Sequence, residues 1–369
     1  MNQTLLTWLV FILAFGGMVL IHEFGHFIAA RLCKIEVEEF GIGLPTPGAI
    51  TLFTWQGTRF TFNWLPFGGF VRPKGENDPN VPGGLSAASP WKRLVVLFAG
   101  PLMNLLMAVL IYSIIFTRVG VPDANRVLVS SVTENGPAAQ AGFQYGDIFV
   151  SGNGKAIHNY DELRVIVDAN ESKPVTFVVD RHGNQVELVA TPEMNAEAKR
   201  IMIGVGLGVP FKRPSSPVET LKLGTQYTYY NVRALLALPA QMVRGTLNSE
   251  QSRLVGLKGI YDILQQTVSH DVQASASNAP VSTDPIDQPV RTLELIASLS
   301  ISLGIFNLFP FPALDGGRII FVLPELIFRR RVSPRVENLI HGMGMAFLLL
   351  LMIYINVMDF INPVNVKIP

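Results

Sequence analysis

The chain has 369 residues, of which 49% are hydrophobic and only 15% are charged, whereas about 25% of the residues of an ordinary soluble domain are charged. Its 29 Lys and Arg residues nearly balance 28 Asp and Glu residues, so no net field would attract nucleic acid, and nucleic-acid binding is excluded as the main function. The single cysteine, Cys33, excludes an internal disulfide and any zinc site built on several cysteines.

Four apolar segments come near the length that crosses a bilayer. Spanning about 30 Å of hydrocarbon takes about 20 mostly apolar residues in a helix. The first segment has no basic residue before it and exceeds the length of a signal-peptide core, so a cleaved secretory signal is the less favoured interpretation. The predicted spans are Leu5 to Ala30, Leu94 to Phe116, Leu295 to Phe311 and Leu339 to Phe360.

The distribution of Lys and Arg predicts the orientation of these spans. Seven basic residues lie between the first two spans and five between the last two, whereas the tail before the first span has none. By the positive-inside rule both of these loops face the cytoplasm. The two termini and the long segment from about Thr117 to Arg291 are then expected outside.

The first cytoplasmic loop contains β-prone sequence. Two short runs, Ala49 to Trp55 and Thr58 to Trp64, flank Gln56-Gly57 and predict a β-hairpin. The apolar, glycine-rich stretch from Leu65 to Val71 follows. We expect this backbone at the membrane face or dipping into it, where its polar groups must be paired or line a wet cavity. The composition from Pro73 to Pro90 predicts a loop.

The long outer segment contains one small folded domain, from Val127 to about Val209. Strand-like and helical runs alternate in it, and two apolar strands around Arg181-His182-Gly183-Asn184 predict a hairpin. Between Pro217 and Ser269 apolar residues recur at helical spacing, which predicts amphipathic helices near the membrane surface or, equally, a helical cap on the domain. The stretch from His270 to Pro289 is rich in Ser, Ala, Asp and Pro and predicts a flexible linker.

A metal-binding pattern lies in the second half of the first span. His22-Glu23-Phe24-Gly25-His26 fits H-E-x-x-H, in which two histidines one turn apart on a helix can hold zinc while the adjacent Glu is left to act as a base. Ionisable residues in hydrocarbon are costly, and three together need a cation. The alternative is that these polar side chains only join helices through hydrogen bonds; we favour the metal site.

A third ligand is needed, because catalytic zinc normally takes three from the protein. Asp315 is the ionisable residue that a membrane-buried site could recruit, since Glu294 and Asp359 lie at the outer ends of their spans. Pro310 and Pro312 interrupt the helix before Asp315 and two glycines follow it, so the backbone can unwind and aim its carboxylate at the metal. The alternative for this segment is a plain helix-ending turn.

Several motifs together resemble the site-2 protease family, and within it the bacterial PDZ-containing intramembrane metalloproteases of the RseP type. Their order and spacing cover the chain from end to end. The matching segments are His22 to His26, Gly68 to Arg72, Ala99 to Asn104, Asn135 to Asp147 for the PDZ-like turn and helix, and Asn307 to Gly317 for N-x-x-P-x-P-x-L-D-G-G.

The resemblance implies an α-helical polytopic membrane protein of four transmembrane helices with a membrane-associated β-hairpin and one extracytoplasmic PDZ-like α+β domain. The corresponding boundaries are 1–31 for the first span with H-E-x-x-H, 32–93 for the cytoplasmic loop with its hairpin, 94–117 for the second span, 120–210 for the PDZ-like domain, 214–269 for the amphipathic helices, 270–290 for the linker, 291–317 for the third span with L-D-G-G, 318–338 for the second cytoplasmic loop and 339–361 for the fourth span.

The resemblance also implies the function. The expected enzyme is a zinc metalloendopeptidase of the bacterial cytoplasmic (inner) membrane, with both termini and the PDZ-like domain extracytoplasmic. It would cleave transmembrane segments of single-pass membrane proteins, such as anti-sigma factors already trimmed outside or remnant signal peptides. Its partners are these substrates and the lipid bilayer. The PDZ-like domain would either contact newly cut peptide termini or act as a size filter, and the resemblance favours the filter.

In this interpretation His22, His26 and Asp315 hold zinc, which would lower the pKa of a bound water to about 7. Glu23 would take the proton from that water and deliver it to the leaving amine. Side-chain donors could share the oxyanion charge or position substrate, and a strand edge could hold the unwound substrate by β-addition. The candidate substrate-binding residues are Asn307, Asn104, Gly68 and Gly69; for Asn104 an interhelical hydrogen bond is an equally good interpretation.

Two features depart from the commonest family pattern. Only one PDZ-like unit is visible, and the S-G-P-x-G-I sequence that often precedes the third span corresponds here to Leu254-Val255-Gly256-Leu257-Lys258-Gly259-Ile260. Two other functions are weaker alternatives. A catalytically silent PDZ scaffold predicts no bound zinc and no effect of Glu23→Gln, and a zinc transporter predicts ligands on several spans and repeat symmetry, neither of which the sequence shows.

Overall fold

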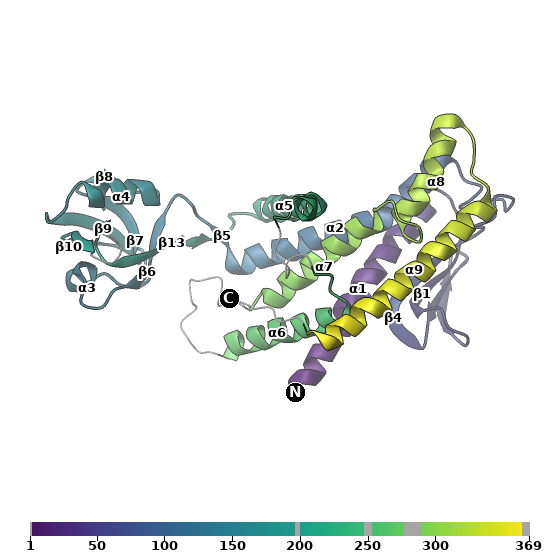
Figure 1. Cartoon of the computed structure of the whole chain (residues 1–369), viewed down its shortest axis with the longest axis horizontal. Coiled ribbons are helices and arrows are strands. Elements are labelled where there is room, and N and C mark those ends of the chain that lie inside the picture. The colour runs from purple at the N-terminus through teal and green to yellow at the C-terminus, as the bar shows by residue number, and fades with distance from the viewer. Residues whose placement is uncertain (1, 196–199, 247–252, 277–288, 364–369) are drawn as a thin grey trace. The chain divides into compact units, whose positions relative to one another are not determined.

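The computed structural model describes residues 2–195, 200–246, 253–276 and 289–363 (Figure 1). The chain divides into two compact units. The first unit comprises the described residues up to 115, from 217 to 276 and from 289 onward, and the second comprises the described residues from 116 to 216. Each unit has its own hydrophobic core.

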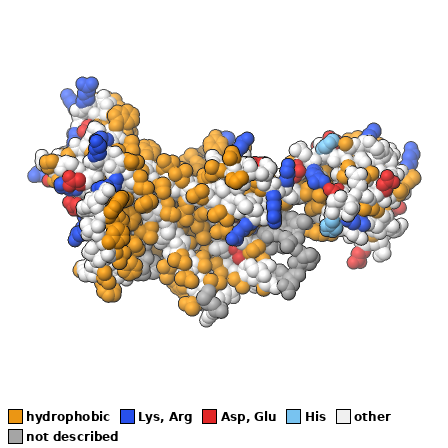
Figure 2. Space-filling model, turned by 180° about the vertical axis from the view of Figure 1, so that it is seen from behind, with side chains coloured by type: hydrophobic (Ala, Val, Ile, Leu, Met, Phe, Trp, Pro, Cys, Tyr) orange, Lys and Arg blue, Asp and Glu red, His pale blue; other side chains and the backbone are white. Residues whose placement is uncertain are grey.

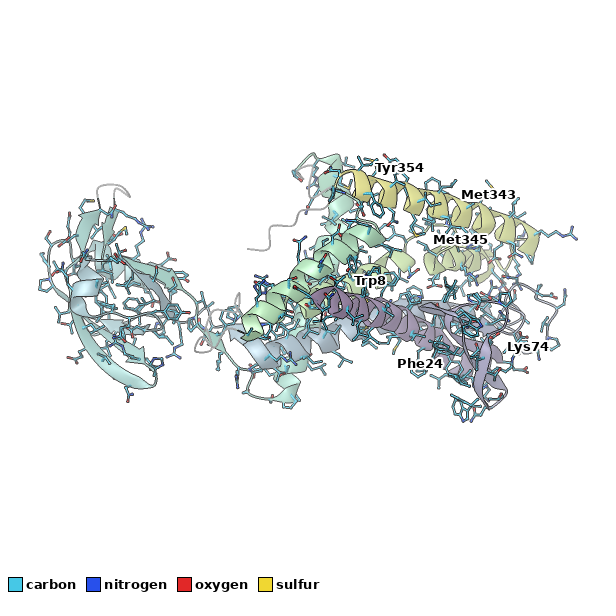
Figure 3. The ribbon with its side chains drawn as sticks, turned by 90° about the horizontal axis from the view of Figure 1, so that it is seen from below. Trp8, Phe24, Lys74, Met343, Met345 and Tyr354 are labelled. Carbon is cyan, nitrogen blue, oxygen red and sulfur yellow. The ribbon has the colours of Figure 1, made fainter. Side chains whose placement is uncertain are left out.

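Three helices among the described residues are long and apolar enough to cross a membrane: α1 (Gln3–Leu32), α2 (Pro90–Val119) and α9 (Pro334–Ile361). Hydrophobic side chains cover much of the surface of the first unit (Figure 2). Trp8, Met343 and Tyr354, labelled in Figure 3, are 45%, 66% and 62% exposed. Because exposing so large an apolar surface to water is unfavourable, we interpret these helices as lipid-facing.

The predicted span Leu295 to Phe311 is interrupted in the structure. Its helix, α7 (Arg291–Asn307), has 17 residues and ends before the two prolines. A new helix, α8 (Asp315–Phe328), begins after the turn and occupies part of the predicted second cytoplasmic loop. The count of four spans therefore stays a prediction, while three apolar helices are observed.

The first unit also contains a four-stranded sheet in the order β2-β3-β1-β4. β2 and β3 pair antiparallel across Gln56-Gly57, both with positive φ, as a tight turn requires. β1 runs parallel to β3 and antiparallel to β4, so the predicted hairpin is part of a larger sheet. The strands are β1 (Val37–Leu44), β2 (Ile50–Trp55), β3 (Thr58–Phe62) and β4 (Leu65–Pro73).

A buried carboxylate ties this sheet together. Glu39 on β1 accepts hydrogen bonds from Arg72 Nη1 on β4 at 2.9 Å and from Thr61 Oγ1 on β3 at 2.8 Å. The rings of Phe27 of α1, Phe40 of β1 and Phe60 of β3 pack within 5.6–5.7 Å of one another. The sheet is thus fastened to α1, the helix that carries the H-E-x-x-H motif.

Two further helices complete the first unit, α5 (Pro217–Val243) and α6 (Leu257–Ala276). α6 packs on α1 through Phe11, Leu264 and Val268, and it runs through seven residues of the stretch predicted to be a linker. A capping interaction explains why this part is ordered as helix. Asp271 on α6 accepts hydrogen bonds from the backbone N–H groups of Arg291 and Thr292 at the start of α7, at 3.1 and 2.9 Å. The rest of the predicted linker, 277–288, lies outside the described residues.

The second unit is an α+β domain around one sheet with the path β10-β9-β7-β6-β13. Its core contains the fully buried Val129, Phe149 and Phe177. The sheet strands are β6 (Val127–Val132), β7 (Ile148–Gly152), β8 (Lys155–Ala156), β9 (Val175–Arg181), β10 (Asn184–Ala190) and β13 (Val205–Gly208). The helices are α3 (Pro137–Ala141) and α4 (Tyr160–Asp168), and two short ladders pair β5 (Val121–Pro122) with β14 (Phe211–Lys212) and β11 (Glu193–Asn195) with β12 (Arg200–Met202).

One buried ion pair anchors the loop between α3 and β7. Asp147 has no exposed surface and accepts two hydrogen bonds from Arg181 of β9, both at 2.7 Å, and one from Gln144 N at 2.9 Å. The hydrogen bonds from Arg181 to Asp147 raise the pKa of the Arg181 guanidinium. Loss of one member of such a pair typically costs about 3–5 kcal/mol, so this pair is central to the domain's stability.

Candidate metal centre

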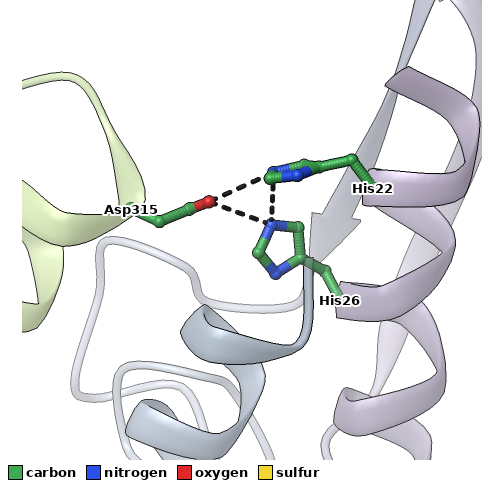
Figure 4. Close-up of side chains that lie close together, drawn as sticks. All are labelled: His22, His26 and Asp315. Atoms are coloured by element: carbon green, nitrogen blue, oxygen red, sulfur yellow. Dashed lines mark hydrogen bonds and ion pairs between the residues drawn. The ribbon is translucent and has the colours of Figure 1, made fainter. Parts of the chain in front are cut away.

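Three potential metal ligands converge inside the first unit (Figure 4). His22 and His26 project from the same face of α1, one turn apart, and Asp315 is the first residue of α8. The Nε2 atom of His22 lies 3.1 Å from Asp315 Oδ2 and 3.2 Å from His26 Nε2, and the third side of the triangle, from His26 Nε2 to Asp315 Oδ2, is 3.4 Å. His22 is buried and the other two are half-buried.

These separations fit a tetrahedral metal ion. Zinc bonded to nitrogen and oxygen at about 2.0–2.1 Å holds its ligands about 3.3–3.4 Å apart at the corners of a tetrahedron. The observed triangle of 3.1, 3.2 and 3.4 Å is close to that value. Two histidines and a carboxylate are also a donor set that catalytic zinc takes, with the fourth corner left open.

The imidazole of His26 is oriented by the backbone of α2. His26 Nδ1 lies 2.7 Å from the carbonyl oxygen of Val96. Because a carbonyl can only accept, Nδ1 carries the proton and donates it, which leaves the lone pair of Nε2 to face His22 and Asp315. Metal-binding histidines are commonly held in the correct tautomer by such a partner.

The second imidazole ligand has an amide partner. The side chain of Asn104 on α2 is fully buried. Its Nδ2 lies 3.2 Å from His22 Nδ1, and its Oδ1 has no hydrogen-bond partner among the described residues. Turning the amide by 180° would place Oδ1 against Nδ1–H and leave His22 Nε2 for the metal. Asn104 is thus placed as an orienting partner of His22 rather than as an interhelical link alone; its backbone carbonyl also accepts from Ser300 at 2.8 Å.

Glu23 lies beside the ligand cluster but bonds elsewhere. Its Oε2 accepts the backbone N–H of Val71, on β4, at 3.0 Å. One carboxylate oxygen is therefore fixed by the sheet and the other can take a proton. The hydrogen bond also shows that the outer edge of β4 faces α1 at the height of the ligands.

Two glycines let α1 and α2 approach closely enough to form the site. A side chain at Gly100 would collide with His26 Nε2 and lie 2.8 Å from His22 Nε2. A side chain at Gly25 would collide with the carbonyl oxygen of Ala99 and lie 2.7 Å from Met103 Cγ. The Ala99-Gly100-Pro101 sequence, which lies inside α2, thus has a packing role at this site.

Two more glycines allow Asp315 to reach the ligand cluster. A side chain at Gly316 would collide with the carbonyl oxygens of Leu308 and Phe309, and one at Gly317 would collide with that of Phe311. The double glycine after Asp315 therefore lets the start of α8 lie directly against the turn that follows α7.

The other predicted substrate-binding residues have described contacts elsewhere than at the ligand triangle. Asn307 donates through Nδ2 to Leu303 O at 3.0 Å, one turn earlier in its own helix. Gly68 and Gly69 are on β4, where added side chains would meet Val19 at 3.4 Å and Leu20 at 2.8 Å. None of the interactions described for these three residues joins them to the histidines or Asp315.

Sequence analysis missed several contributions to the site. The Val71 N–H and the Val96 carbonyl are backbone groups, which a motif search cannot select because every residue has them. Gly100 stood within a quoted motif, but its role depends on the distance between two helices. Only the clustering of a short A-G-P signal with an apolar helix could have suggested it.

Comparisons with known proteins agree with this chemistry. A sequence model described as peptidase family M50 matches residues 10–351. A Clostridium perfringens protein whose name describes a zinc metalloprotease is 30% identical over 354 residues, covering 96% of this chain and 98% of its own. A similarly named protein of Clostridium acetobutylicum is 28% identical, covering 96% and 97% of the two chains. The protease eep of Enterococcus faecalis is 28% identical, covering 95% and 97%.

We expect Gly100→Ala to weaken zinc binding, because the added methyl group must displace one or both imidazoles. Misplaced or poorly supported ligands typically lower metal affinity by about 10- to 100-fold. Competition of purified protein with a chromogenic chelator measures the change. Gly17→Ala is the matched control, since a side chain there meets nothing within 4 Å, and equal affinities of the two variants would contradict this role of Gly100.

Proposed function

The chain belongs to peptidase family M50, the family of the site-2 proteases, and from that premise we propose that it hydrolyses peptide bonds within the transmembrane segments of single-pass membrane proteins. It is a zinc metalloprotease, and the sequence-based resemblance to site-2 proteases is confirmed. Within the proposal His22, His26 and Asp315 are the zinc ligands and Glu23 is the general base. The observation that carries it is the convergence of three ligating atoms beside Glu23 on an apolar helix.

The proposed reaction is the addition of water to the scissile carbonyl. Bound zinc supplies Lewis-acid chemistry, which activates the water and polarises the carbonyl. Glu23 takes one proton from the attacking water on its unoccupied oxygen as the new C–O bond forms. It then gives that proton to the amide nitrogen as the C–N bond breaks. The Val71 N–H keeps the other oxygen of Glu23 in place throughout.

A transmembrane helix must be unwound before its carbonyl can be attacked, because its backbone groups are hydrogen-bonded internally. The outer edge of β4 supports a way of holding the unwound segment. Val71 points its N–H outward toward Glu23, and by alternation along the strand the backbone groups of Gly69 point the same way. An extended substrate could pair with this edge by β-addition, close to the general base.

The second unit is proposed to select substrates. All residues assigned to the chemistry belong to the first unit, so the second unit has no part in bond cleavage. We propose that it is a PDZ-like domain that excludes substrates with bulky outer domains. Capture of newly cut chain ends is the second candidate. By resemblance, the substrates would be trimmed anti-sigma factors or remnant signal peptides.

The proposed location is a bacterial inner membrane, with both termini and the second unit outside. The excess of Lys and Arg in the two loops between spans supports this orientation. In the structure several of these basic residues join the two loops: Arg318 contacts Glu76, Arg331 Nη1 donates to the Ser86 carbonyl at 2.7 Å, and Arg93 pairs with Glu325 at 2.6 Å. These contacts support a common side for both loops.

Replacing the general base tests the proposed reaction. In Glu23→Gln the amide oxygen can still accept the Val71 N–H, but the side chain cannot take a proton. We expect cleavage of a tagged single-pass membrane protein in proteoliposomes to fall by about 10²- to 10⁴-fold, with one zinc per chain retained. Glu38→Gln, at an exposed position on β1, is the control. Undiminished cleavage by Glu23→Gln would favour a scaffold in which another component cuts.

Cysteine labelling tests the orientation. In a Cys33→Ala background, a cysteine at Asn153 should react with an impermeant maleimide in intact spheroplasts, whereas one at Lys74 should react only after the membrane is opened. Labelling of both cysteines from the same side would exclude the proposed orientation. It would also exclude the proposal that the second unit senses the outer domain of the substrate.

Deletion of Val127 to Val209 distinguishes filter from capture. The ends of the deleted segment are close together, because β5 pairs with β14 and Asp123 N donates to Pro210 O at 2.9 Å, so a short Gly-Ser linker can close the gap. A filter predicts that the deleted enzyme cuts untrimmed substrate as well as trimmed substrate. Capture predicts slower cutting of trimmed substrate while untrimmed substrate stays resistant. Complete loss of cleavage with zinc still bound would contradict both roles.

A further inference from the structure

The turn that delivers Asp315 is irregular. After α7 ends, Phe311 N donates to Phe309 O at 2.7 Å and Leu314 N donates to Phe311 O at 3.2 Å. Between them Ala313 has φ +78°, in the left-handed region that an alanine seldom adopts because its Cβ crowds the backbone. A backbone that holds an alanine in this conformation must be fixed by its surroundings.

The surroundings that fix this turn belong to α9. His341 Nδ1 accepts the N–H of Ala313 at 2.8 Å. Gly344 is buried, and a side chain there would collide with the Pro312 side chain and lie 2.7 Å from the Pro312 carbonyl oxygen. The ring of Phe347 packs against that of Phe311 with centroids 5.8 Å apart.

The three residues of α9 act on consecutive parts of the turn. His341, Gly344 and Phe347 are spaced three apart, so they lie along one side of the helix. We call them the α9 contact face. They meet Ala313, Pro312 and Phe311 in that order, which are the residues two to four before Asp315.

We propose that the α9 contact face consists of positioning residues that hold the 309–314 turn in the conformation needed for Asp315 to bind zinc. His341 makes the most directional of these contacts, because it accepts a hydrogen bond from the N–H of Ala313, the residue with positive φ. The proposal rests on the proposed ligand role of Asp315. It gives the last helix, which contributes no ligand, a defined part in building the metal site.

The hydrogen bonding of His341 distinguishes this role from simple core packing. Nδ1 must be unprotonated to accept from Ala313, so the neutral ring carries its proton on Nε2. That atom is buried and has no hydrogen-bond partner among the described residues. The ring also packs beside that of Phe321 on α8, with centroids 5.4 Å apart. A leucine could keep that packing without burying an unpartnered N–H, which is unfavourable, so the feature that calls for a histidine is its hydrogen bond with Ala313.

Two pairs of variants test the proposal in the full-length protein. His341→Leu removes the acceptor with little change in volume, whereas His341→Asn keeps an acceptor, since Asn Oδ1 can occupy the position of His Nδ1. Gly344→Ala places a methyl group against Pro312, whereas Gly342→Ala, two residues away on the same helix, meets nothing within 4 Å. Both alanines raise helix propensity equally, so a difference between them reports the contact with the turn.

Two measurements are needed, one of them without metal. In zinc-free protein, hydrogen–deuterium exchange of a peptide spanning 309–315 reports whether the Ala313 N–H is protected. In zinc-loaded protein, chelator competition reports affinity. We expect faster exchange and about 10- to 100-fold weaker zinc binding for His341→Leu and Gly344→Ala. We expect exchange and affinity within a few-fold of wild type for His341→Asn and Gly342→Ala.

Several results would overturn the proposal. Equal effects of His341→Leu and His341→Asn would show that the hydrogen-bond acceptor does not matter. Equal effects of Gly344→Ala and Gly342→Ala would show that the close contact between Gly344 and Pro312 does not matter. If His341→Leu fails to fold, the glycine pair decides. Asp315→Asn separates this proposal from the ligand assignment: if zinc affinity is unchanged in that variant, the assignment fails, while exchange at 309–315 still shows whether α9 fixes the turn.

Discussion

The closeness of His22 Nε2, His26 Nε2 and Asp315 Oδ2, which lie within 3.4 Å of one another, is the constraint on which the first unit depends. The Val96 carbonyl directs the His26 ring proton away from the centre, and the Asn104 amide does the same for His22 once its oxygen is turned toward Nδ1. The two Nε2 lone pairs and the carboxylate would then repel one another without a cation. The low-dielectric surroundings of an apolar helix bundle would strengthen that repulsion. A bound metal would therefore be a structural partner of these helices as well as the source of the chemistry, and its loss should loosen the contact of Asp315 with His22 and His26.

Two of the proposed ligands, His22 and Asp315, are 293 residues apart in the chain, so tertiary packing must define their separation. Small residues do much of this, because Gly25 and Gly100 bring α1 against α2 while Gly316 and Gly317 bring α8 against its own turn. The sheet adds a third support through the hydrogen bond from the Val71 N–H to Glu23. Each of these three supports is a backbone group or the absence of a side chain. The centre is therefore occupied by the side chains proposed to do the chemistry: His22, His26, Asp315 and Glu23.

The parts that could be predicted from sequence are those with a local pattern. H-E-x-x-H works through one helical turn, and the long apolar helices follow from composition. Strand β1 was not anticipated because its Glu39 is buried, against the usual preference, by partners on two other strands. The interruption of α7 was expected from its prolines, but the helix that follows was not. The contacts of Val71 and His341 join residues 48 and 28 positions apart, so no local pattern contains them.

Strand β2 has a consequence for handling the protein outside its membrane. It forms one edge of the four-stranded sheet, all six of its residues are exposed, and Ile50, Leu52, Phe53 and Trp55 are apolar. Such an edge offers unpaired backbone groups and apolar side chains to any other strand. If the sheet lies at the membrane face, as the sequence predicts, lipid would cover these side chains and keep the edges of neighbouring molecules apart. Once detergent is diluted, the same strand becomes a template for self-association, so the sheet rather than the helices will set the conditions under which the enzyme stays monodisperse.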